Sequence, residues 1–246
     1  YMAPEVVTGS KMPSKQTDRY SLSVVLFLLF YGNHPLEGTR VLACPCMTEK
    51  YEKQFYGSDA IFIYDTDNKT NLPVRGVHNN VMRKWPAFPG ILRTAFTQEF
   101  SHECLTNPDK RCLERDWQKT IQKVRDMLVV CPQCKEETFV EDVQTSQCVC
   151  CSKTFNVAGA LKINDRHILL TPDTKIYLDM DNKPDVQVIS VVGDRYPIQL
   201  KNITSGNWTV ETPSGKLKSV EPGQMMPVKA GLKVSFGGTI KGDIII

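Results

Sequence analysis

Nine cysteines offer the most reactive side chains in the chain, and four of them form two pairs of metal-ligand spacing. Cys131 and Cys134 make the first Cys-x-x-Cys pair, and Cys148 and Cys151 make the second, with residues 135–147 between them. This spacing lets both sulfurs of a pair face one ion, and four thiolates supply the tetrahedral soft shell that Zn²⁺ accepts. Because all four ligands come from protein, the pattern predicts a structural zinc site.

Cys150 makes the ligand choice ambiguous, since a third cysteine stands inside the second pair. Only the choice of Cys148 with Cys151 restores the two-residue spacing, so Cys150 is interpreted as a spare thiol. A disulfide or redox pair is the alternative, and the lack of a secretion signal disfavours it. Four other cysteines fit no standard metal pattern and are expected to be buried free thiols, namely Cys44, Cys46, Cys104 and Cys112.

The composition is that of an ordinary globular protein. Of 246 residues, 41% are hydrophobic and 23% charged, which argues against long disorder. The net charge of +3 offers no basic stripe, which disfavours nucleic-acid binding. The longest apolar run, Val24 to Tyr31, is far below the ~18 residues of a membrane span. A cytoplasmic protein without membrane association is the expectation.

The chain divides into three zones that differ in their sequence pattern. Residues 1–130 show helical periodicity, including an apolar run over residues 22–30 for which Asp18 stands as the expected N-cap. Residues 131–158 hold the clustered cysteines, and residues 159–246 hold brief apolar runs between turn signals. The predicted fold class is therefore multi-domain: a mainly α part, then a small zinc ribbon, then an all-β sandwich.

Within the first zone, residues 38–84 are rich in Gly, Pro, Asn and Asp and carry one apolar run. Structureless loops of this length are uncommon in compact domains. The stretch is either a long ordered excursion or a functional insertion, and the sequence leaves both open.

Four short motifs occur in order, at residues 3–5, 18–22, 32–36 and 107–111, and together they resemble the large lobe of eukaryotic-type protein kinases, as found in bacteria. Ala3, Pro4 and Glu5 resemble the Ala-Pro-Glu motif that closes the activation segment. The other three resemble the start of the central helix, the turn after it and the Asp-Pro-x-x-Arg segment, at residues 18–22, 32–36 and 107–111. By this resemblance the first zone is a kinase C-lobe remnant.

The resemblance implies structural roles for three residues. Glu5 would pair with Arg111 as a buried ion pair, and Asp18 would accept hydrogen bonds from the backbone of the catalytic loop. Tyr1, ahead of Met-Ala-Pro-Glu, is more similar to the Ser/Thr class than to tyrosine kinases. Breaking a buried pair of this kind typically costs ~3–5 kcal/mol.

No catalytic residue is assigned, because the chain lacks the motifs of phosphoryl transfer. A Gly-rich loop, a strand lysine, a catalytic Asp with its Asn and a metal-binding Asp all lie ahead of Ala-Pro-Glu in kinases. The sequence begins at Tyr1 without an initiator Met and is interpreted as a piece of a longer protein. ATP and Mg²⁺ would bind only in that full-length parent.

The last zone holds four segments, at residues 197–202, 208–210, 220–223 and 231–237, that together resemble the second half of forkhead-associated domains. That family reads phosphothreonine with an Arg after Gly and a Ser-x-x-His loop, and neither occurs in matching order here. A sandwich used for protein docking is the expectation.

Together these features predict the regulatory or docking portion of a Ser/Thr kinase. The arrangement is similar to kinases of stress-associated gene clusters, whose partners are a von Willebrand A-type protein and a metal-dependent phosphatase. The alternative is a non-catalytic scaffold derived from a degenerate kinase. A nucleic-acid-binding zinc ribbon is a third hypothesis, which the charge balance disfavours.

Overall fold

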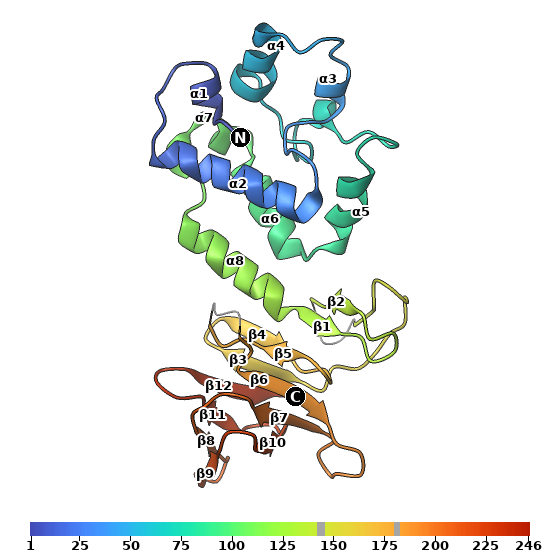
Figure 1. Ribbon diagram of the computed structural model, residues 1–246, viewed down its shortest axis with the longest axis vertical. Coiled ribbons are helices and arrows are strands. Elements are labelled where there is room, and N and C mark those ends of the chain that lie inside the picture. The colour runs from blue at the N-terminus through green and yellow to red at the C-terminus, as the bar shows by residue number, and fades with distance from the viewer. Residues whose placement is uncertain (142–145, 180–182) are drawn as a thin grey trace. The chain divides into compact units, whose positions relative to one another are not determined.

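The computed structural model describes residues 1–141, 146–179 and 183–246 (Figure 1). These form two compact units, Tyr1–Ile121 and Gln122–Ile246, and the division falls inside helix α8 (Glu114–Asp126). The first unit is helical, whereas the second is built from antiparallel sheets.

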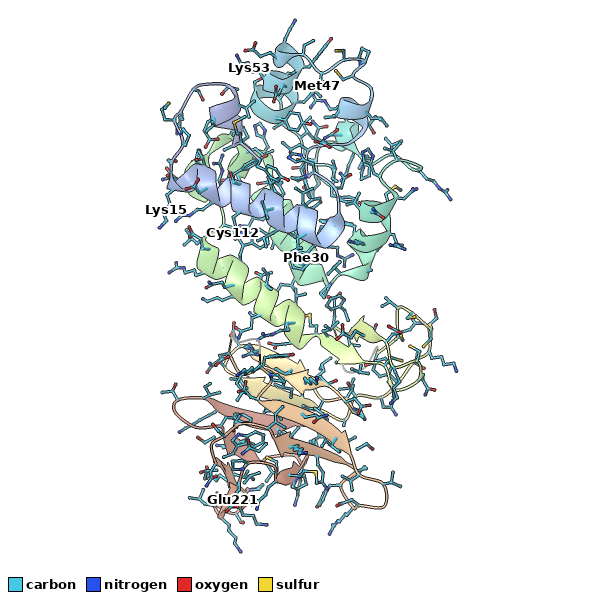
Figure 2. All side chains as sticks on the ribbon, in the orientation of Figure 1. Lys15, Phe30, Met47, Lys53, Cys112 and Glu221 are labelled. Carbon is cyan, nitrogen blue, oxygen red and sulfur yellow. The ribbon has the colours of Figure 1, made fainter. Side chains whose placement is uncertain are left out.

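The first unit is organised around helix α2 (Lys15–Tyr31), whose two ends are marked by Lys15 and Phe30 in Figure 2. Ser14, rather than the expected Asp18, is its N-cap, in a capping box with Thr17. Gly32 ends the helix with φ 67°, a left-handed conformation that glycine adopts without steric cost.

Aromatic side chains fill the core of this unit. Tyr20, Phe27 and Tyr31 lie on the buried face of α2 at helical spacing. Phe27 lies edge-on to Phe62 and Phe96, with ring centroids 5.5 and 5.1 Å apart. Such edge-to-face pairs add to the free energy gained from burying the rings.

The opposite face of α2 is open although its sequence is apolar, since Val25 and Leu29 are 49% and 72% exposed. Since successive residues of a helix point in different directions, one surface of α2 meets the core while the other faces outward. The helix is therefore buried on one side only.

The remaining helices of the first unit are short. Between residues 38 and 84 the chain is an ordered excursion, fixed by the buried Asn71, whose amide donates to the carbonyls of Leu36 and Ile61. The helical elements of the unit besides α2 and α8 are α1 (Pro4–Val7), α3 (Thr39–Leu42), α4 (Glu49–Lys53), a π-helical turn (Gln54–Ser58), a 3₁₀ turn (Lys69–Asn71), α5 (Asn79–Ala87), α6 (Gly90–Glu99), α7 (His102–Thr106) and a 3₁₀ turn (Pro108–Lys110).

The second unit holds a two-stranded, a four-stranded and a six-stranded sheet. The first is the hairpin of β1 (Leu128–Val130) and β2 (Glu137–Phe139). The four-stranded sheet has the order β10-β7-β6-β5 and the six-stranded sheet the order β4-β3-β12-β11-β8-β9. Their strands are β3 (Ala160–Ile163), β4 (Arg166–Leu169), β5 (Lys175–Ile176), β6 (Val186–Ser190), β7 (Ile198–Asn202), β8 (Trp208–Glu211), β9 (Leu217–Val220), β10 (Met225–Pro227), β11 (Lys233–Ser235) and β12 (Lys241–Ile245).

The two larger sheets share one hydrophobic core. Leu200 and Val188 come from the four-stranded sheet, and Leu161, Trp208 and Val234 from the six-stranded one. Alternation along the strands produces this arrangement, since successive side chains of a strand point to opposite faces. β12 follows the pattern, with Gly242 and Ile244 buried between exposed neighbours.

The predicted fold class is wrong. A mainly α kinase-lobe remnant, a separate ribbon and an all-β sandwich would be three successive bodies, but the described chain is a mixture of helices and several antiparallel sheets in two units. The cysteine segment does not stand alone, because Cys131 and Cys148 share a core with Ala160 and Leu169. A segment of this size buries too little apolar surface by itself, so its core is completed by residues of strands β3 and β4.

A buried ion pair ties the end of α8 to β4. Arg166 donates to both carboxylate oxygens of Asp126 at 2.7 and 2.8 Å and also to the carbonyls of Tyr177 and Leu178. Both side chains are less than a tenth exposed. No local sequence pattern predicts this pair, which joins residues forty positions apart.

We expect Arg166→Met to lower the free energy of unfolding by ~3–5 kcal/mol, because Asp126 would remain buried without its partner. The double variant Asp126→Leu/Arg166→Met should recover most of that loss. Urea denaturation of the three proteins measures both effects. A single variant that unfolds at the wild-type urea concentration would contradict this account.

Candidate metal centre

Four thiols converge at one point of the second unit. The sulfurs of Cys131, Cys134, Cys148 and Cys151, here called the thiol cluster, lie within 4.8 Å of one another. Two of the distances are 3.9 Å, between Cys131 and Cys151, and 3.6 Å, between Cys134 and Cys148. Four sulfurs placed tetrahedrally about 2.3 Å from one ion would be about 3.8 Å apart. The thiol cluster can therefore hold a metal ion.

Two turns of the same design hold the thiol cluster. In the first, the carbonyl of Cys131 accepts from the N–H of Lys135, and the N–H of Cys131 donates to the carbonyl of Glu136. In the second, Cys148 makes the equivalent bonds with Ser152 and Lys153.

The fifth residue of each turn has a left-handed backbone, with φ 63° at Lys135 and 58° at Ser152. Neither residue is glycine, so each turn holds a conformation that costs free energy outside a fixed structure. The repeated hydrogen bonds of the turns offset that cost and aim two thiols from each turn at one point.

Backbone N–H groups of Cys150 and Cys151 point at the sulfur of Cys148, at 3.3 and 3.5 Å. Burial opposes ionisation of this thiol, but those N–H groups and the neighbouring thiols lower its pKa to about 7. A thiolate is the form that binds a metal. The backbone thus prepares Cys148 for ligation.

The structure places the other cysteines outside the thiol cluster. Cys150 is exposed, and all nine cysteines are free thiols, so no disulfide supports the redox alternative. The expectation of buried thiols holds for Cys104 but is wrong for Cys46, which is exposed. Cys46 lies in a bend of the chain among other exposed residues.

Glu5 and Arg111 lie side by side, 106 positions apart in sequence. The guanidinium donates from Nη1 to Oε1 at 2.8 Å and from Nη2 to Oε2 at 2.7 Å. It also donates to the carbonyls of Gln16 and Cys104 and lies over the ring of Tyr20. The Arg111 side chain is fully buried. Burial raises the pKa of Glu5, but the hydrogen bonds and charge of Arg111 more than compensate and lower it.

The other residues of the kinase-like motifs, Ala3, Pro4 and Asp18, do not take part in this ion pair. Ala3 and Pro4 are buried at the start of α1, where Pro4 occupies a position suited to its missing N–H. Asp18 is exposed in the first turn of α2. Its predicted partner, a catalytic loop, does not occur in this sequence.

Sequence reasoning missed a buried polar network in the first unit. Glu99 and Ser23 are both buried and share a hydrogen bond of 2.9 Å, and the indole of Trp117 donates to Ser23 at 3.1 Å. Glu99 and Trp117 are 76 and 94 positions from Ser23 in the sequence, and no local pattern links them to it.

Comparison with known proteins identifies no relative: no family model, no curated protein and no solved structure matches the chain. Across the described ranges, no helix has the length and apolar character to cross a membrane.

We expect Cys131→Ser to reduce bound metal from about one ion per chain to almost none and to destabilise the second unit, because a metal-dependent core loses a ligand. Cys150→Ser is the matched control and should keep full metal content. Elemental mass spectrometry and circular dichroism of both variants test the assignment. Metal loss in the Cys150→Ser protein alone would reverse the choice of ligands.

Proposed function

We propose that this chain is the carboxy-terminal docking and regulatory portion of a Ser/Thr protein kinase and holds no ATP site of its own. The observation that carries the proposal is the Glu5–Arg111 pair. It joins two motifs that are far apart in sequence, at the positions where the kinase resemblance implies such a pair. A guanidinium with two parallel bonds to a carboxylate fixes orientation as well as distance.

The outer face of α2 supports the same proposal. Asp18, Leu22, Val25 and Leu29 follow one another at helical spacing, so an exposed carboxylate stands at the head of an apolar stripe. Val25 and Leu29 are among the more exposed apolar side chains of the chain. A catalytic loop whose backbone donates to Asp18 would cover this stripe.

We propose Zn²⁺ as the ion of the thiol cluster, in a structural role. Four thiolates suit zinc, and four protein ligands leave no coordination position for substrate. The core around the cluster, formed by Val129, Val140 and Phe155 with two residues of the larger sheets, depends on the turns that the ion would hold together. The ion would thereby stabilise the docking unit.

The proposed partners are proteins. On resemblance alone, a von Willebrand A-type protein and a metal-dependent phosphatase are the first to test, in the cytoplasm. The alternative function is a non-catalytic scaffold that keeps the pair and the stripe but has lost phosphoryl transfer.

The coding sequence upstream of Tyr1 distinguishes these functions. A Gly-rich loop, a strand lysine, a catalytic Asp and a metal-binding Asp should all be encoded there. Loss of the lysine and both Asp residues within an otherwise similar stretch would favour the scaffold. An upstream sequence without any of these motifs would refute the kinase proposal.

In the longer protein, we expect Asp18→Asn to reduce autophosphorylation by at least about tenfold, or ~1.4 kcal/mol in the barrier. The reason is that the backbone of the catalytic loop would lose its acceptor. Asp67→Asn, a change of the same kind at an exposed loop position, is the control. Radiolabelled ATP and a zinc assay of each protein give the readouts. Equal activity of the two variants would exclude this role for Asp18.

A further inference from the structure

The hydroxyl of Ser23 has three polar neighbours within hydrogen-bond distance in the core of the first unit. The indole Nε1 of Trp117 lies 3.1 Å away, the carbonyl of Arg19 2.9 Å away, and Oε1 of Glu99 2.9 Å away. Ser23 is fully buried and Glu99 is 2% exposed. The hydroxyl of Ser23 therefore depends on these partners and not on bulk water.

Counting hydrogens shows that the three contacts depend on a proton. A serine hydroxyl has one hydrogen and two lone pairs. Trp117 can only donate and the carbonyl of Arg19 can only accept, so the contact with Glu99 decides the pattern. A protonated Glu99 donates to Ser23, and the serine hydrogen then goes to Arg19, which satisfies every group. An ionised Glu99 takes the serine hydrogen for itself, so the carbonyl of Arg19 keeps only the backbone hydrogen bond that it accepts inside helix α2.

The second oxygen of Glu99 extends the network to another segment. Oε2 accepts from the backbone N–H of Cys112 at 2.6 Å. Cys112, labelled in Figure 2, follows Arg111 directly and precedes α8. One carboxyl group thus contacts α2 through Ser23 and the chain that leads into α8 through Cys112, while it belongs to α6.

We propose that the proton on Glu99 is a conformational switch that sets how tightly α2, α6 and the segment from Cys112 to Trp117 are joined. With the proton bound, the network uses all its donors and acceptors. Without it, a buried charge competes for the only hydrogen of Ser23, and the three elements separate more easily.

The electrostatic surroundings place the switch near neutral pH. Burial raises the pKa of Glu99 to about 7, although the N–H of Cys112, the hydroxyl of Ser23 and the charges of Arg111 and Arg19 all act to lower it. Burial is the larger effect because ions lose more solvation than neutral groups do.

The other titratable groups around Glu99 do not change charge in the same range. Burial raises the pKa of Cys112 to about 11 and raises those of Tyr20 and Cys104, so all three stay neutral. Glu99 also lines a cavity of 350 Å³. The other charged residues that line this cavity are Lys110, Arg111 and Asp116.

The sign of the pH effect follows from the two states of the chain. An unfolded glutamate has a pKa of about 4.3, whereas the folded Glu99 keeps its proton to about 7. Folding therefore takes up a proton between these values. The contribution of Glu99 to stability is full below about pH 4.3, falls as the pH rises and levels off above about pH 7.

A pH titration of the wild-type chain with ¹³C-labelled glutamate carboxyl groups tests the switch directly. One carboxyl signal should titrate near neutral pH, and the indole N–H signal of Trp117, assigned with Trp117→Phe, should move with the same midpoint. Absence of any glutamate carboxyl that titrates above about pH 6 would overturn the proposal. This measurement needs no variant of Glu99 to fold.

Glu99→Gln then isolates the group, because glutamine donates and accepts as the protonated acid does. Its Trp117 signal should no longer titrate, and its urea midpoint should be constant between about pH 5 and 8, where the wild-type midpoint falls. Glu103→Gln, an exposed position on α7, is the matched control and should behave as wild type. A Trp117 titration that persists in Glu99→Gln would also overturn the proposal.

Discussion

The convergence of four sulfurs constrains the cysteine segment of the second unit, residues 131–151. Two turns bring the sulfurs together, each with a non-glycine residue of positive φ, Lys135 or Ser152, whose conformation costs free energy. A metal ion bonded to all four sulfurs would hold the two turns face to face. The apolar residues around the thiol cluster come partly from strands β3 and β4, so the ion and the sheets would support one another.

In the first unit, an ion pair joins segments that are far apart in sequence. Glu5 lies in the short helix α1, which is too short to be stable alone, and Arg111 lies in an irregular segment. Because Arg111 also donates to Gln16 and Cys104, one guanidinium joins four stretches of chain. Removing it would leave the carboxylate of Glu5 and the carbonyl of Cys104 without this donor.

The sequence predicted those features that depend on residues close together in the chain. The four cysteines of the thiol cluster were predicted because two residues separate the members of each pair, and the strands were predicted from brief apolar runs between turn signals. The division into three bodies failed because it depends on which surfaces meet, and the contacts of Cys148 with Ala160 and Leu169 carry no local signal. For the same reason, the sequence did not predict the contact of Asp126 with Arg166 or that of Ser23 with Glu99.

Helix α2 connects the two proposals made for the first unit. Ser23 lies on its buried face, whereas Val25 and Leu29 lie on its exposed face, and a helix transmits displacement as a nearly rigid body. If a partner covers the exposed stripe, it binds to the same helix whose inner contacts the proton on Glu99 adjusts. Linkage then requires that the partner and the proton affect one another's binding, unless α2 keeps the same position in both protonation states.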